Sequence, residues 1–464
     1  MLRLLGWILG MSVAMVIVVT AAVLLLLWAS LPRHEGEVVL RGLQAPVSVE
    51  RDEIGVATLT AANRLDLARA LGFVHAQERY FQMDLLRRAG AGELAELLGA
   101  AVVDVDRERR QYRLRARARA AFSDAPDEDQ LLLLAYTRGV NTGLRALMAK
   151  PFEYFLLRSE PQEWRPEDSL LVAAALYFDL TDERGLRVLR SAQLAETLPP
   201  ALLDFLLSAT SEWDAPLLGE TGSLPPIPGQ EIYDLRSLDP ALFEGTPASS
   251  RTVSELGSNS FAVDAGISDG LGAIVVGDMH LSLRVPNTWY RARMRVDGSA
   301  GFDITGVTLP GLPMLIAGSN GHVAWAFTNS YGDWTDLIEL ELDPQKADRY
   351  RGPEGWAQLE TQTETILVAG RDPISLAVRE SPWGPVMQAG DKAYAVRWLP
   401  IMPGAINLRL AWLEQARDLE EAMAVANGAG LPPQSMVIAG RDGRIAHHVD
   451  MLRERRAERR EIDG

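Results

Sequence analysis

Ser258 stands between a polar stretch rich in Pro, Gly and Ser and a segment with alternating apolar residues, and the small residue Gly257 precedes it. A serine exposed as a new N-terminus carries its own general base, because its α-amine titrates near about 7.7–8.0 and can take the hydroxyl proton. Such a site needs a small preceding residue, a spacer that can leave and a strand that starts at the serine. Residues 215–263 offer all three. The alternative interpretation is an ordinary Gly-Ser linker.

Other chemistries find less support. The chain has no cysteine, which excludes a thiol nucleophile, a disulfide framework and Cys-ligated zinc. Its six histidines include no His-Glu-x-x-His and no pair at the spacing of a metal site, and no Gly-rich phosphate loop is followed by lysine. Four polar residues in a predicted helical region are interpreted as structural rather than catalytic: His75, Gln77, Glu93 and Glu96.

Composition describes a large globular chain. The 464 residues are 47% hydrophobic and 23% charged, enough to bury a sizeable core. Lys and Arg number 46 against 62 Asp and Glu, giving a formal net charge of −16. Because this charge repels phosphate backbones, we predict no nucleic-acid partner.

The N-terminus predicts a membrane anchor. No charged residue occurs between Arg3 and Arg33, and Leu4–Trp28 is almost wholly apolar. A helix of this length crosses about 30 Å of hydrocarbon and exceeds a usual signal-peptide core. We therefore predict an uncleaved signal anchor over residues 1–33, in the inner membrane, with the rest facing the periplasm or cell exterior. The alternative is a buried helix of a soluble protein.

The remaining chain divides into a helical region at 34–235, a spacer at 236–257 and a strand region at 258–464. Apolar spacing of three and four residues predicts helices at Leu65–Leu98 (broken at Gly90 and Gly92), Glu128–Met148 and Pro166–Leu176. One or two short strands are expected within Glu37–Thr60. Alternation predicts a strand at Phe261–Ala265, and the apolar run Ala273–Val276 predicts a buried strand after a turn. A second set of strands is expected at Val323–Thr328, Leu337–Leu342, Thr365–Ala369 and Tyr394–Trp398.

Several ordered blocks carry a family resemblance. They are Gly72–Arg79, Gly92–Gly99, Gly257–Val263, Gly277–Leu281, Pro310–Pro313 and Gly318–Trp325. Spread over roughly residues 36–449, they resemble the penicillin acylase family of N-terminal nucleophile hydrolases. The resemblance implies an α+β fold, a four-layer αββα sandwich, here preceded by one transmembrane helix.

The resemblance also implies catalytic roles. Ser258 would be the nucleophile and the processing point, so that cleavage before it gives an α and a β chain. His280 matches a histidine near the nucleophile that orients the amine and the scissile group; the alternative is a loop histidine without a role. Asn329 matches the residue whose backbone N–H donates to the oxyanion, a donor worth about 3 kcal/mol of barrier.

A structural calcium ion is implied as well, and no organic cofactor. Asp333, the Thr335 carbonyl and Asp336 match the family's metal-binding stretch, and oxygen ligands suit Ca²⁺. A further carboxylate is expected after the helix that starts at Pro166, and our choice there is Glu183. The alternative for all of them is a solvated acidic loop.

The C-terminus departs from the family pattern. Asp450–Gly464 is a run of Arg and Glu without strand periodicity. Family members usually continue for some hundreds of residues, which include the Asn side chain that completes the oxyanion hole. The resemblance therefore implies a chain that is C-terminally truncated relative to the family, either as a truncated or frameshifted copy or because the remainder is a separate chain. Two hypotheses remain. One is an anchored amidohydrolase acting on N-acylated small molecules such as β-lactams or N-acyl homoserine lactones; the other is a non-catalytic remnant or binding protein of the same fold.

Overall fold

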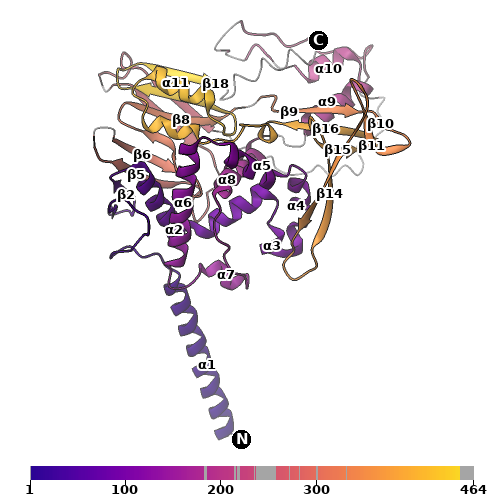
Figure 1. The fold of residues 1–464 in the computed structure, drawn as a ribbon. Helices are drawn as coiled ribbons and strands as arrows, with labels where there is room; N and C mark the ends of the chain where they lie inside the picture. Colours follow the sequence, from indigo (N-terminus) through magenta and orange to yellow (C-terminus); the bar gives the residue numbers. More distant parts are fainter. Residues whose placement is uncertain are drawn as a thin grey trace.

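A large mixed sheet, covered by helices on one face and by a two-stranded hairpin on the other, organises the molecule (Figure 1). The structure is a computed structural model. It describes residues 2–181, 185–208, 210–213, 216, 220–234, 236, 258–270, 272–281, 283–298, 301–330 and 332–449.

The N-terminal helix α1 (Leu2–Ala29) projects away from the folded body (Figure 1). Its segment Arg3–Ala29 is long and apolar enough to cross a membrane, a test of length and composition that a signal sequence also passes. Only its end contacts the body, where the Ala149 N–H donates to the Ala29 carbonyl at 3.0 Å. A helix with so much exposed apolar surface needs a non-aqueous neighbour, which agrees with an anchor or a signal sequence.

Three helices form the centre of the helical region: α2 (Arg64–Ala91), α6 (Asp127–Arg145) and α8 (Pro166–Leu180). Glycine lets α2 and α6 touch, since a Cβ on Gly139 would lie 1.9 Å from the Arg69 carbonyl oxygen. Gly90 has the same function against α8, with a Cβ 2.2 Å from the Leu171 oxygen. Shorter helices surround these three: α3 (Ala95–Leu98), η1 (Gly99–Val102), α4 (Val103–Arg110), α5 (Leu114–Asp124), α7 (Phe152–Leu156), α9 (Leu186–Thr197) and α10 (Pro200–Leu206).

The large sheet joins segments far apart in sequence. Its order is β1-β2-β5-β6-β7-β8-β17-β18, antiparallel except for the parallel pair β2 and β5. Strands from the mainly helical region thus complete a sheet built by the later half. The bounds are β1 (Ser48–Arg51), β2 (Ala57–Ala61), β5 (Tyr290–Val296), β6 (Phe302–Thr308), β7 (Leu315–Ser319), β8 (Val323–Asn329), β17 (Gln434–Gly440) and β18 (Ile445–Val449).

The two faces of the large sheet meet different layers. Trp325 and Phe327 of β8 point into the main core with the helices, among them α11 (Leu419–Gly428) and η5 (Arg409–Glu414). Between them Ala326 faces the other way, and a Cβ on Gly277 would lie 2.6 Å from its Cβ. The hairpin of β3 (Ser258–Val263) and β4 (Ile274–Met279) therefore packs directly on this second face.

A smaller unit lies beside the helices. One sheet has the order β13-β14-β15-β16-β9 and another the order β10-β11-β12. Arg113, in a left-handed conformation between α4 and α5, bonds Glu364 at 3.1 Å and Glu380 at 2.5 Å, which ties β13 and β14 to the helices. The bounds are β9 (Thr335–Leu340), β10 (Leu342–Asp343), β11 (Lys346–Gly352), β12 (Gly355–Gln358), β13 (Glu360–Ile366), β14 (Ile374–Ser381), β15 (Gly384–Ala389) and β16 (Lys392–Trp398), followed by η4 (Leu399–Ile401).

Most predicted elements are confirmed, with local errors. The predicted break at Gly92 is correct, because that residue caps α2 at φ 67°. The predicted break at Gly90 is wrong, because this glycine continues the helix and serves its close approach to α8. The strand expected at Thr365–Ala369 begins earlier and ends at Ile366. The predicted spacer 236–257 lies almost wholly outside the described residues.

Candidate active site

Ser258 is the first residue of β3, and its side chain is partly exposed. It pairs with Met279, so that His280 follows directly after its partner strand at the same end of the hairpin. Gly257 and the spacer before it lie outside the described residues. Within the described part, Ser258 thus has the strand that a processed N-terminal serine requires.

The far end of β3 fixes the direction of the strand over the sheet. There the Ala265 N–H donates to the Gly443 carbonyl at 3.0 Å, in the turn between β17 and β18. From Val263, two residues before Ala265, β3 runs back about 17 Å to Ser258, at about 3.3 Å per residue. Because β3 contacts β8 and β17 along the way, Ser258 lies toward the sheet end where β8 stops at Asn329 and β17 starts at Gln434.

The side chain of Asn329 is held in place by two neighbours. Its Nδ2 donates to the Leu180 carbonyl at the end of α8, 3.3 Å away. Its Oδ1 accepts from Gln434 Nε2 at 3.1 Å. The amide thus links α8, β8 and β17, a structural use that leaves any oxyanion contact to the backbone. Gln434 was not predicted as part of the site.

His280 lies in an exposed position with an acidic neighbour. Its Nε2 is 2.8 Å from Asp278 Oδ2. Asp278 pairs across the hairpin with Asn259, the residue after Ser258. A carboxylate bonded to one imidazole nitrogen orients the ring, so Asp278 is a positioning partner of His280 in this structure.

Aromatic side chains build a wall beneath the end of α8. Phe178 and Tyr112 lie 4.9 and 4.8 Å from the Trp398 ring, and the Arg109 guanidinium stacks over Phe178 at 4.7 Å. Trp398 Nε1 donates to Thr181 Oγ1 at 2.9 Å. This packing fixes the C-terminal end of α8 against Trp398 at the end of β16.

Three of the four predicted calcium ligands lie within the described residues, in β9 or just before it. Thr335, buried, and Asp336 begin β9, and Asp333 precedes it at an exposed position. Glu183 lies outside the described residues. Among the residues that the structure describes, no three His, Asp or Glu side chains come together to hold a metal ion. Because Glu183 is not among those residues and Thr335 would bind through its carbonyl, the calcium site stays a prediction.

His75 is buried, and each of its two ring nitrogens is hydrogen-bonded to a hydroxyl group. Thr308 Oγ1 donates to the Tyr290 carbonyl at 3.1 Å and so accepts from His75 Nε2 at 2.9 Å. Tyr136 Oη accepts from the Gly311 N–H and donates to His75 Nδ1 at 2.7 Å. Burial lowers the pKa of His75 to about 3, so the ring is neutral. These bonds join α2 and α6 to the sheet, which supports a structural role.

The other three helix residues make structural contacts too. Gln77 accepts from the Arg33 N–H at 2.9 Å and donates to the Gly143 carbonyl at 2.5 Å. Glu93 pairs with Arg115 at 2.5 Å, and Glu96 with Arg88 at 2.7 Å. None of these partners is a candidate catalytic group.

The sequence contains one further serine motif, which was not predicted above. Gly266–Gly270 matches Gly-x-Ser-x-Gly, the pattern of a nucleophile elbow. An elbow requires a strand followed by a helix, whereas Ser268 lies in the turn between strands β3 and β4. Its hydroxyl is buried and donates to the Gly272 carbonyl at 2.5 Å. The motif is thus a turn in this fold.

The comparisons with known proteins agree with the resemblance. The model of the penicillin amidase family matches residues 46–460, and the chain belongs to this family. Membership, together with the stacked helix, sheet and hairpin layers, confirms the predicted α+β fold class; these are three of the four expected layers.

Three individual relatives have between 24% and 31% sequence identity to this chain. The acyl-homoserine lactone acylase QuiP of Pseudomonas aeruginosa is 31% identical over 387 residues, which cover 81% of this chain and 44% of that protein. The penicillin acylase 2 proenzyme of Pseudomonas sp. (strain SE83) is 29% identical over 448 residues, covering 91% and 54%. A thermostable penicillin G acylase structure from Alcaligenes faecalis has 24% identity and a TM-score of 0.34, covering 38% of this chain and 98% of that one. The chain spans about half the length of the curated relatives it matches.

Proposed function

We propose that this chain belongs to an acylase that hydrolyses the amide bond of N-acylated small molecules through an acyl ester on Ser258. The observation that carries the proposal is the position of Ser258 at the start of β3, toward the sheet end where β8 stops at Asn329. Membership of an amidase family supports the reaction class.

The chemistry begins with cleavage before Ser258, which frees its α-amine. That amine accepts the Oγ proton while Oγ attacks the amide carbonyl of the substrate. The Asn329 N–H donates to the oxyanion of the tetrahedral intermediate. The C–N bond then breaks, the leaving amine takes the proton, and water hydrolyses the ester to release the carboxylate. His280, oriented by Asp278, would face the leaving group.

The relatives suggest two substrate classes. One is named for acyl-homoserine lactones and another for penicillin. Both classes carry a secondary amide between an acyl chain and a heterocyclic amine. We propose an N-acylated amine of this kind as the substrate, with the acyl group undefined by the described residues.

The experiment is a panel of N-acyl homoserine lactones and N-acyl β-lactams offered to the protein as its host makes it, with copurifying polypeptides retained. Rapid quenching and peptide mass analysis should find the acyl group on the peptide that begins with Ser258. Turnover with the acyl group on another residue would contradict the proposal. Binding without any turnover would favour a binding protein of the same fold.

We further propose that α1 anchors the protein in the inner membrane with the body outside the cytoplasm. Its Arg3–Ala29 segment has the required length and composition. We expect the full chain to stay with membranes after carbonate extraction. Recovery of the intact chain in a soluble periplasmic extract would contradict this proposal.

Calcium binding by Asp333, Thr335, Asp336 and Glu183 stays a prediction. A bound ion stabilises the folded state by mass action, so the unfolding midpoint should rise with calcium and this rise should be lost in Asp336→Ala. Asp391→Ala, in an exposed turn between β15 and β16, is the matched control and should keep the response. Calcium-dependent stability unchanged in Asp336→Ala would refute the assignment.

A further inference from the structure

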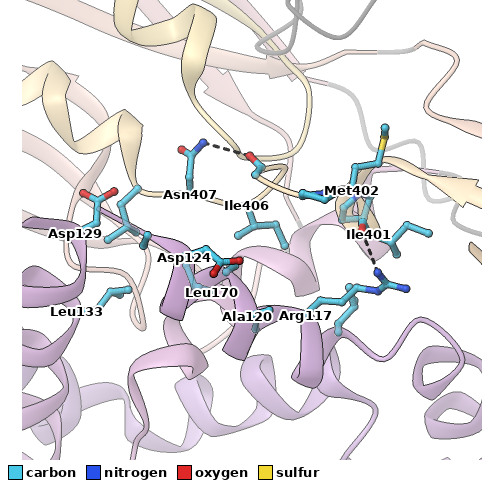
Figure 2. Close-up of a pocket in the computed structure, with 18 of the residues that line it drawn as sticks. Arg117, Ala120, Asp124, Asp129, Leu133, Leu170, Ile401, Met402, Ile406 and Asn407 are labelled. Carbon is cyan, nitrogen blue, oxygen red and sulfur yellow. Dashed lines mark hydrogen bonds between the residues drawn. The ribbon is translucent and has the colours of Figure 1, made fainter. Parts of the chain in front are cut away.

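A cavity of about 420 Å³ lies between the helical region and the chain that follows η4 (Figure 2). Its walls come from α5, the start of α6, Leu170 of α8 and residues 400–408. The volume lies within the range of about 300–1,000 Å³ found for small-molecule sites. No residue assigned to the active site lines it.

The floor of this cavity is apolar and firmly built. Leu114, Leu133, Leu170 and Leu408 line it, and each is nearly inaccessible as part of the main core. Three further lining residues on α5 are alanines, Ala118, Ala120 and Ala121, and their small side chains leave the space open. Because close-packed core residues form the floor, the cavity does not depend on a loose loop alone.

The rim is acidic. Asp124 and Asp129 line the cavity from the helical side and face the segment that carries Ile406 and Asn407 (Figure 2).

The arginines near Asp124 and Asp129 neutralise only part of the negative charge of the cavity rim. Arg117, the arginine in the lining, bonds Glu380 at 2.6 Å, the Ile401 carbonyl at 3.2 Å and the Tyr112 carbonyl at 2.9 Å. Its charge is thus engaged by Glu380. Burial and Glu128 raise the pKa of Asp129, while Arg409 opposes them. A desolvated carboxylate of this kind gains more from an incoming cation than an exposed one does.

We propose that this cavity binds an organic ammonium ion with a compact apolar body. The ammonium group would pair with Asp129 and Asp124 at the rim, and the apolar body would fill the leucine-lined floor. A carboxylate of the same shape would meet two like charges. The proposal is independent of the acylase reaction, since it uses none of its residues.

Calorimetric titration of the full chain with cyclohexylmethylamine tests the proposal. We expect saturable one-to-one binding. The matched anion cyclohexanecarboxylate and the matched alcohol cyclohexylmethanol should bind at least tenfold more weakly. Equal affinity for the three probes, or no saturable binding of the amine at millimolar concentration, would overturn the proposal.

Two variants and a control locate the binding. Asp129→Asn should weaken amine binding at least tenfold by removing the charge, and Ala120→Leu should do the same by filling an exposed part of the lining. Asp127→Asn changes a carboxylate in the same helical turn that does not line the cavity, so its affinity should match the wild type. Unchanged affinity in either test variant would place the amine elsewhere, for instance in detergent around α1, and would overturn the assignment.

Discussion

Ser258→Ala should leave the chain uncleaved and lower amide hydrolysis by on the order of 10⁴-fold or more, because one hydroxyl serves both reactions in our proposal. On this proposal, the Ser258 hydroxyl of the wild type attacks the preceding carbonyl in an N→O acyl shift, and water then releases a new N-terminal serine. Ser258→Cys should still process, since a thiol makes the same shift, but should hydrolyse amides poorly. The measurement is N-terminal sequencing of the product chain, paired with substrate turnover.

Ser260→Ala is the matched control for this experiment. Ser260 lies two residues further along β3, on the same face and similarly part-buried. It should process and hydrolyse as the wild type does. A product beginning at a residue other than Ser258, or an active Ser258→Ala protein, would remove the basis of the functional proposal. Loss of activity in Ser268→Ala alone would instead favour the turn serine.

Local pattern predicted the elements better than their assembly. The apolar pattern identified β3, β4, β8 and β16, although β4, which was expected to be buried, is mostly exposed. It could not predict that β1 and β2 join the edge of a sheet formed more than two hundred residues later, since the parallel pair of β2 and β5 depends on tertiary packing. The same limit explains Gly90, whose role is contact with α8 and not helix termination.

The residues of the candidate site also fall into two groups, those with a local sequence signal and those that only the fold brings together. Ser258 could be found from its small neighbour, its spacer and the strand after it, all of which are local features. The contact of Asn329 with Leu180 and Gln434 joins three separate segments and has no local signal. The pair of Ser435 and His447, 2.6 Å apart on β17 and β18, was missed for the same reason. Only strand register reveals that β18 brings His447 beside β17.

The stability of the fold should depend on pH through His75. Its pKa is about 3 in the folded protein and 6.5 in its ordinary state, so below pH 6.5 the unfolded chain binds a proton that the folded chain does not. The free energy of unfolding should therefore fall as pH decreases from 6.5 toward 3, by about 1.4 kcal/mol per pH unit from this residue where the difference is one full proton. Above pH 6.5 the residue should contribute no slope.

Guanidinium unfolding of wild type, His75→Gln and His75→Leu across this pH range measures the effect. Glutamine cannot titrate, so His75→Gln should lose this part of the slope, and its amide can still bond Tyr136 or Thr308. Leucine leaves the buried Tyr136 hydroxyl without its acceptor, and His75→Leu should lower the unfolding free energy at pH 7 by about 2–4 kcal/mol. His322→Gln, at an exposed position, should stay within about 0.5 kcal/mol of wild type. An identical pH slope in His75→Gln and wild type would mean that the ring is not held neutral between Tyr136 and Thr308, and that another group controls acid unfolding.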